Sequence, residues 1–201
     1  MNTVIVATKN AHKVSEMAEI LKDTQLSLVT MTDAGVEGEI EETGKTFEEN
    51  AKIKARTVAK MTGKPALADD SGLSVDALGG EPGIYSARYA SIDGNNATDD
   101  KNIDKLLENM KAIPGNERTA RFVSALALCF PDGREYTAIG VCEGLITRER
   151  RGEGGFGYDP VFFCTKLSKT FGEASADEKN AVSHRNRALT QLKEIIKDIE
   201  F

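Results

Sequence analysis

Residues 65–76 have the sequence Pro-Ala-Leu-Ala-Asp-Asp-Ser-Gly-Leu-Ser-Val-Asp, and this stretch decides how the rest of the chain is interpreted. Pro65 to Ala68 is a short apolar run of the kind that forms a buried strand. Two carboxylates, a hydroxyl and a glycine follow, which predicts a turn at residues 69–72. Open α/β sheets bind ligands where such strands end. The stretch therefore predicts an α/β sheet with a candidate site at this turn, although Asp-Ser-Gly is also an ordinary turn sequence.

Two adjacent carboxylates follow the apolar run. Neighbouring side chains of an extended strand point to opposite faces, so Asp69 and Asp70 do not both face one crevice. We select Asp70 as the one that faces the candidate site. The expectation is that Asp70→Asn abolishes function with the fold intact and that Asp69→Asn has a smaller effect.

The composition indicates a globular protein. With 201 residues and 40% hydrophobic content, we expect a single domain over 1–201, with room for two lobes around a cleft. The net charge of −6 argues against nucleic acid as the main partner. No apolar run approaches the length of a membrane span, and a strand-like run at Val4 to Ala7 leaves no room for a signal peptide. We expect a cytoplasmic protein whose three cysteines are buried free thiols.

The first candidate binding segment lies between a strand and a helix. A β-branched run at 3–8 precedes the polar residues 9–13, and an apolar helical stripe follows. Lys9 and Lys13 sit at the start of this helix, where unpaired N–H groups and the dipole favour an anion such as phosphate. The segment lacks the P-loop spacing, and a solvated helix start remains the alternative.

An acidic loop at 37–45 ends at a second helix. Thr46 to Glu49 has the pattern of a capping box, which fixes the loop and makes its carboxylates candidate ligands for a hard cation. A simply solvated acidic run is the alternative. Lys54, on the helix that runs from 47 to about 61, lies off the apolar stripe and is a candidate substrate-binding residue.

Later segments supply a hairpin and further polar candidates. Runs at 118–130 and 135–147 flank Pro131-Asp132-Gly133, which predicts an antiparallel pair and hence a mixed sheet. The aromatics Phe156 and Tyr158, in a glycine-rich loop, either stack on a planar ring or plug the edge of the core. A capping box at 175–178 precedes Lys179. A final helix begins with His184 and Arg185, whose charges oppose the dipole and so suggest a functional role.

Six motifs occur in one order along nearly the whole chain, and together they resemble the inosine/xanthosine triphosphate pyrophosphatase family. They are Thr8-Lys9-Asn10-Ala11-His12-Lys13, Glu41-Glu42-Thr43-Gly44, Ala68-Asp69-Asp70-Ser71-Gly72-Leu73, the segment 79–89, Gly155-Phe156-Gly157-Tyr158-Asp159-Pro160 and Ser183-His184-Arg185. The resemblance implies an elongated α/β fold with a mixed central sheet, flanking helices and a substrate cleft between two lobes. It also implies a homodimer that hydrolyses (d)ITP and XTP to the monophosphate and pyrophosphate with Mg²⁺.

The resemblance also implies roles for individual residues. Asp70 is the metal ligand and general base, and Glu42, aided by Glu41, binds Mg²⁺. The implied substrate contacts are Thr8, Lys9, Asn10, Ala11, His12 and Lys13 for the triphosphate, Ser71, Phe156, Gly157, Tyr158 and Asp159 for the nucleoside and base, Lys179 for the nucleotide, and His184 and Arg185 for the purine edge.

The residue chemistry agrees with these roles. A triphosphate carries several negative charges, which lysines and a helix start meet only in part, so a divalent cation is the natural complement. Donors at 184 and 185 pair with a 6-oxo purine and not with adenine. Two alternatives stay open: a sensor that binds nucleotides without hydrolysis, and a pyrophosphatase for pyrimidine or modified triphosphates.

Overall fold

A computed structural model describes residues 2–201, which form one seven-stranded sheet of order β2-β1-β3-β4-β5-β6-β7. β1 pairs in parallel with β2 and β3, whereas β6 is antiparallel to β5 and β7. The predicted mixed sheet is therefore confirmed. The strands are β1 (Asn2–Val6), β2 (Leu26–Thr30), β3 (Ala66–Val75), β4 (Thr119–Cys129), β5 (Glu135–Ile146), β6 (Phe162–Cys164) and β7 (Lys169–Thr170). The α-helices are α1 (Ala11–Leu21), α2 (Phe47–Thr62), α3 (Asp99–Asn109), α4 (Ala176–Val182) and α5 (His184–Lys197).

The chain divides into two compact units, and β3, β4 and β5 contribute residues to both. Unit 1 comprises residues 1–70, 124–140 and 185–201, and unit 2 comprises 71–123 and 141–184. A single domain over 1–201 stays a prediction, as does the substrate cleft.

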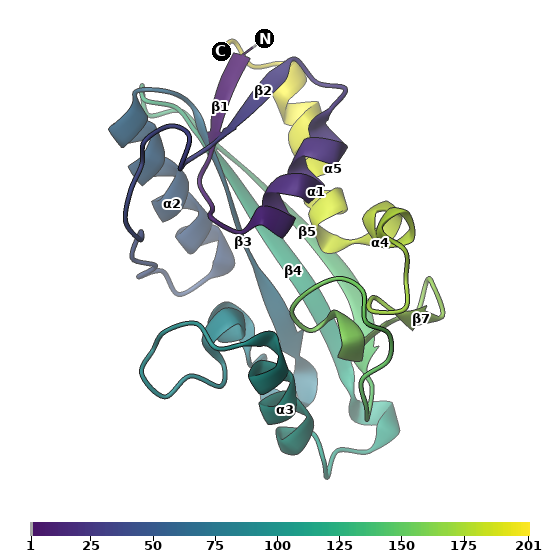
Figure 1. The fold of residues 1–201 in the computed structure, drawn as a ribbon. Coiled ribbons are helices and arrows are strands. Elements are labelled where there is room, and N and C mark those ends of the chain that lie inside the picture. The colour runs from purple at the N-terminus through teal and green to yellow at the C-terminus, as the bar shows by residue number, and fades with distance from the viewer. Residues whose placement is uncertain (1) are drawn as a thin grey trace. The chain divides into compact units, whose positions relative to one another are not determined.

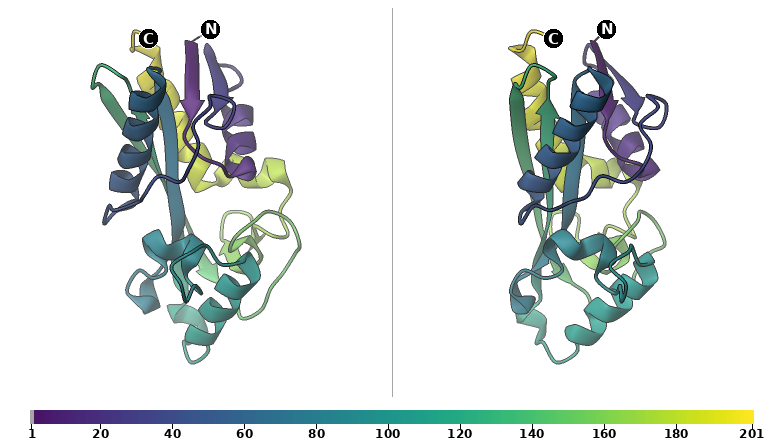
Figure 2. Two further views of the ribbon diagram at one scale, coloured as in Figure 1. Left: turned by 60° about the vertical axis from the view of Figure 1, so that its left-hand side comes forward. Right: turned by 90° about the vertical axis from the view of Figure 1, so that its left-hand side faces the viewer.

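Unit 1 is a sheet with helices on both faces. Alternate residues of β1 point to opposite sides, so Val4 and Val6 pack with α1 and α5, whereas Ile5 packs with α2. Figures 1 and 2 show α1 beside α5 on one face of this part of the sheet and α2 on the other. Because both faces are covered, the strands consist of continuous apolar runs, as expected for parallel strands.

Strand β3 differs from the sequence-based prediction. The predicted turn at residues 69–72 is wrong, because the strand continues from Ala66 to Val75. Both carboxylates have partners far along the chain: Asp69 accepts a hydrogen bond from Ser124 of β4, and Asp70 pairs with Lys54 of α2. Asp69 and Asp70 therefore face opposite sides of the sheet, as the alternation rule predicts.

The helix starts follow their local signals. Asn10 caps α1 by accepting from the Lys13 N–H, and Thr46 caps α2 by accepting from the Glu49 N–H. The box at 46–49 is only half formed, because Glu49 accepts from the Lys45 N–H and not from Thr46. The predicted box at 175–178 is complete.

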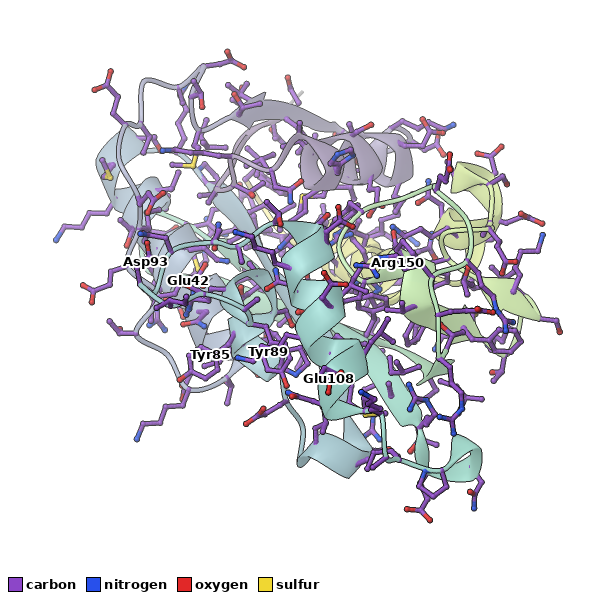
Figure 3. All side chains as sticks on the ribbon, turned by 60° about the horizontal axis from the view of Figure 1, so that its bottom comes forward. Glu42, Tyr85, Tyr89, Asp93, Glu108 and Arg150 are labelled. Atoms are coloured by element: carbon purple, nitrogen blue, oxygen red, sulfur yellow. The ribbon has the colours of Figure 1, made fainter. Side chains whose placement is uncertain are left out.

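Unit 2 has its own core, built from β6, α3, the start of β4 and the end of β5. Tyr89 packs in this core, accepts a hydrogen bond from Asn109 of α3 and donates one to Glu81. Figure 3 shows Tyr89 near α3, with Glu108 on the exposed part of that helix. Across the two units, the three cysteines are buried and free, which confirms the prediction for them.

Candidate functional site

The candidate site in unit 1 is a cluster of charged side chains around residues 69 and 70 of β3. Four segments supply it: the start of α1, the acidic loop, the middle of α2 and β3 itself. We call Lys13, Glu42, Lys54, Asp69 and Asp70 the β3 cluster. All five side chains are buried or half-buried. The cluster joins distant parts of the chain, because Lys13 is separated from Asp69 by 56 positions in the sequence.

On the α2 side, one ammonium group joins two carboxylates. Lys54 Nζ lies 2.9 Å from Glu42 Oε1 and 2.9 Å from Asp70 Oδ1. The two oxygens are therefore separated by no more than twice that distance, so the carboxylates of Glu42 and Asp70 converge.

Asp70 has an oxygen available for a ligand. Its Oδ2 is buried and has no hydrogen-bond partner within residues 2–201. Burial raises the pKa of Asp70, and the positive charge of Lys54 opposes that effect. A buried carboxylate oxygen without a donor suits a hard cation, so Asp70 and Glu42 fit one as ligands.

The predicted third ligand is not gathered with the other two. Glu41 is exposed. Within the part of the chain that the structure describes, no three His, Cys, Asp or Glu side chains come together as a metal-holding group. A cation at Glu42 and Asp70 would need further oxygen ligands from water or from a phosphate.

On the α1 and α5 side, Asp69 is the centre of a buried network. Asp69 Oδ1 accepts from Ser124 Oγ at 2.8 Å, and Oδ2 accepts from Arg185 Nε at 2.8 Å. Lys13 Nζ lies 3.4 Å from the same Oδ2, and Arg185 Nη1 donates to Glu16. Burial by itself would raise the pKa of Asp69, but Arg185 and Lys13 hold that pKa well below its usual range.

Two lysines meet at the backbone of the same residue. The carbonyl oxygen of Asp69 accepts from Lys13 Nζ at 3.3 Å and from Lys54 Nζ at 3.2 Å. Burial lowers the pKa of Lys13, and the charge of Asp69 partly offsets the effect. Two ammonium groups held side by side form a local positive region in an acidic protein, and such a region can bind a phosphorylated ligand.

The other predicted phosphate-binding residues lie at the start of α1. Asn10 is exposed and uses its side chain for the cap, while Thr8 Oγ1 accepts from the Asn10 N–H at 3.1 Å. The side chains at 9, 11 and 12 are exposed. This part of the motif offers a helix N-terminus, as predicted.

Sequence reasoning missed Asn50, which anchors the acidic loop. Asn50 is fully buried in the first turns of α2, and its Oδ1 accepts from the Gly44 N–H at 2.8 Å. A Cβ at position 44 would lie 2.6 Å from that oxygen, so only glycine allows this approach. The sequence signal that could have found it is its position three residues after Phe47, where the buried face of a helix usually has an apolar residue.

Sequence reasoning also missed Ser124 and Glu16, the partners of Asp69 and Arg185. Neither lies in a motif. A serine in an apolar strand and a glutamate on a helix are ordinary residues, so no local signal in the sequence marks them.

Unit 2 brings together another set of predicted residues. Lys179 Nζ donates to Asp159 Oδ2 at 2.7 Å, and the Phe156 N–H donates to the same oxygen. The Phe156 ring packs on the Lys179 ammonium at 4.5 Å. Gly155 has a φ of +76°, and a Cβ there would collide with Asp159. The loop is thus fixed around a buried ion pair.

Tyr158 fits the alternative of an aromatic residue that plugs the core. Its ring is buried in the unit 2 core, and its hydroxyl donates to the Ser86 carbonyl at 2.8 Å. Burial raises the pKa of this phenol. Gly157 and Ser71 are half-buried. Ring stacking of Phe156 on a base stays a prediction.

The two residues at the start of α5 belong to different units. His184, in unit 2, is buried and stacks on Phe122 with ring centroids 4.8 Å apart. Arg185, in unit 1, is 1% exposed and donates to Asp69 and Glu16. These acidic partners explain how Arg185 is accommodated at a helix N-terminus. A role for Arg185 at the purine edge stays a prediction.

The fold and the β3 cluster define a class of protein: an α/β protein with a partly buried site of carboxylates and lysines, suited to an anionic ligand accompanied by a cation. The chain belongs to the Ham1 family, whose model matches residues 4–195. This confirms the family membership that the six motifs predicted.

Named relatives and solved structures resemble the chain along its whole length. The dITP/XTP pyrophosphatase of Shigella flexneri is 51% identical over 200 residues, which cover 98% of this chain and all of that protein. The dITP/XTP pyrophosphatase of Bacillus cereus is 50% identical over 198 residues, covering 98% of this chain and 95% of that one. The structure of a HAM1 protein from Coxiella burnetii has a TM-score of 0.89 at 44% identity, covering 99% of this chain and 100% of that one.

Proposed function

We propose that this protein is a nucleoside triphosphate pyrophosphatase that hydrolyses non-standard purine nucleotides, namely dITP, ITP and XTP. The products are the nucleoside monophosphate and pyrophosphate, and the activity removes unwanted purines from the nucleotide pool. Relatives of about 50% identity that are named dITP/XTP pyrophosphatases support this substrate class.

The observation that carries the proposal is the convergence of Glu42, Lys54 and Asp70. A protein that only bound nucleotides would need positive charge, but it would not need two carboxylates held together beside lysines. Asp70 Oδ1 and Glu42 Oε1 are less than 6 Å apart, because each accepts a hydrogen bond of 2.9 Å from the Lys54 ammonium. Such a carboxylate pair serves to bind a cation and to activate water.

The chain's own residues then divide the work. Lys13, with the N-terminus of α1, pairs with phosphate oxygens. Asp70 orients a water molecule, and its carboxylate takes the proton. Glu42 and Asp70 would hold Mg²⁺, with water or phosphate oxygens as its remaining ligands. When bound, the cation stabilises negative charge on the phosphoryl oxygens.

The base contacts come from the later motifs. Within the predicted base-binding segment 156–159, Phe156 stacks on the base. Lys179 contacts the nucleotide, and His184 with Arg185 prefers a 6-oxo purine over adenine. Ser71 completes the substrate contacts. These assignments rest on the motif resemblance, and the buried ion pair between Lys179 and Asp159 supports a fixed loop at this position.

The test is release of pyrophosphate from dITP, XTP, ATP and dTTP at equal concentration with Mg²⁺. We expect turnover of dITP and XTP to exceed that of ATP and dTTP at least tenfold. The matched pair of variants is Asp70→Asn, which should be inactive, and Asp23→Asn, an exposed aspartate that should keep full activity. Tight binding of dITP without release of pyrophosphate would instead identify a sensor, and preference for dTTP would identify a pyrimidine enzyme.

Three further properties belong to the proposal: Mg²⁺ as the cation, a cytoplasmic location and a homodimer. In the described residues 2–201, no helix combines the length and apolarity needed to cross a membrane. Omitting the metal in the presence of a chelator should abolish turnover, and light scattering in solution should give twice the mass of one chain.

A further inference from the structure

The atoms proposed to hold a cation are bridged by a side chain. Lys54 Nζ contacts Glu42 Oε1 and Asp70 Oδ1 at 2.9 Å each, which are hydrogen-bond distances for an ammonium and two carboxylates. The side chains of Lys54, Asp70 and Glu42 are 12%, 10% and 24% exposed. The Lys54 ammonium therefore links two carboxylates that are largely shielded from solvent.

Without this positive charge, the two carboxylates would be unfavourable neighbours. Like charges brought together with little solvent repel one another, and each also loses hydration. The acidic loop that carries Glu42 is held in place by the Gly44 N–H bond to Asn50 and by the cap at Thr46, so Glu42 has little freedom to withdraw. The loop anchors hold Glu42 close to Asp70, and the positive charge of Lys54 offsets the repulsion between these two carboxylates.

Lys54 also has a second contact, on the side of the phosphate-binding lysine. Its Nζ donates to the Asp69 carbonyl at 3.2 Å, and Lys13 Nζ donates to the same oxygen. An ammonium displaced from the carboxylates can keep this contact, which leaves it next to Lys13. There it adds a second positive charge for a phosphate group.

We propose that Lys54 is a positioning residue that substitutes for the divalent cation in the metal-free protein. It holds Glu42 and Asp70 together until the cation arrives, then releases at least one of them and turns its charge toward the phosphate chain. This inference rests on the proposed function, because it takes Glu42 and Asp70 as the cation ligands. No bond is made or broken in the exchange.

The experiment uses the full chain without nucleotide. Lys54→Met is compared with Lys52→Met, a substitution of the same type on the same helix, where Lys52 forms an ion pair with Glu48 one turn away. In the presence of a chelator, we expect Lys54→Met to lower the Tm by about 5 °C or more and Lys52→Met by about 2 °C or less. Saturating Mg²⁺ should remove most of the difference between the two variants.

Direct titration with Mg²⁺ alone, followed by calorimetry, tests the displacement. Because the cation no longer competes with an ammonium, we expect Lys54→Met to bind Mg²⁺ at least tenfold more tightly than the wild type. A change of less than twofold, or a metal-free Tm equal to that of Lys52→Met, would overturn the inference. The proposed function would still stand in that case if the wild type binds Mg²⁺ and hydrolyses dITP.

A second variant covers the case in which Lys54→Met does not fold without metal. Lys54→Met combined with Glu42→Gln removes one of the repelling charges. Recovery of the metal-free Tm in the double variant supports the role of Lys54 as a bridge, and failure to recover overturns it. If the wild type itself binds no Mg²⁺, the metal part of the proposed function fails, while the metal-free comparison still tests the bridge.

Discussion

Replacing Asp69 and Asp70 one at a time by asparagine should separate stability from chemistry at two adjacent positions. Asp69 is fully buried and pairs with Arg185, Lys13 and Ser124. Asp69→Asn leaves the guanidinium of Arg185 buried with Glu16 as its remaining acidic partner. Breaking one side of a buried ion pair costs about 3 to 5 kcal/mol. For a protein of this size that is a loss of about 6 to 20 °C in Tm.

Asp70→Asn should have the opposite profile. Its Oδ2 has no hydrogen-bond partner, and an asparagine oxygen still accepts from Lys54. Burial already disfavours the charged form of Asp70, so the main cost is a buried amide group without an acceptor. We expect the unfolding free energy to fall by about 1 to 2 kcal/mol, less than for Asp69→Asn. The loss of a general base should lower kcat by about 100-fold to 10,000-fold.

The assay for this pair is urea unfolding followed by circular dichroism, together with pyrophosphate release from dITP at a temperature where both variants are folded. The sequence predicted the milder loss of turnover for Asp69→Asn, and the structure adds that its loss of stability is the larger. Equal losses of unfolding free energy would refute the account of the Asp69 network. More than a tenth of wild-type kcat in Asp70→Asn would show that Asp70 is not the base.

Three more predictions follow from single contacts. Asn50→Ala removes the acceptor of the Gly44 N–H and should lower the unfolding free energy by about 1 to 3 kcal/mol. It should also raise the Mg²⁺ concentration needed for half-maximal turnover, and an unchanged Mg²⁺ dependence would contradict the role of Asn50 as the anchor of the acidic loop. Arg185→Ala should lower the Tm, because it leaves Asp69 charged and buried, and a dITP to ATP turnover ratio equal to wild type would remove Arg185 from base selection. Burial raises the pKa of Cys129 to about 11, so a thiol reagent at pH 8 should label the native protein far more slowly than the urea-unfolded chain, and equal rates would contradict its burial.

The amino-acid sequence by itself determined the local features of this protein. Helix caps at Thr46 and Ser175 and the apolar stripes of α1 and α2 depend on residues within one or two turns, so spacing alone reveals them. The two strands around Pro131-Asp132-Gly133 depend on a turn of a few residues in the same way. Family membership could also be predicted from the sequence, because the six motifs occur in the family's order along the chain.

The tertiary structure alone decided which groups meet at β3. The strand passes through residues 69–72, where local turn preference predicts a bend, because Ser124 and Lys54 supply partners for the two carboxylates. Arg185 reaches Asp69 across 116 positions of sequence and Glu16 across 169. Such pairs form only when helices from both ends of the chain pack on one sheet, and no local pattern encodes the distance between them.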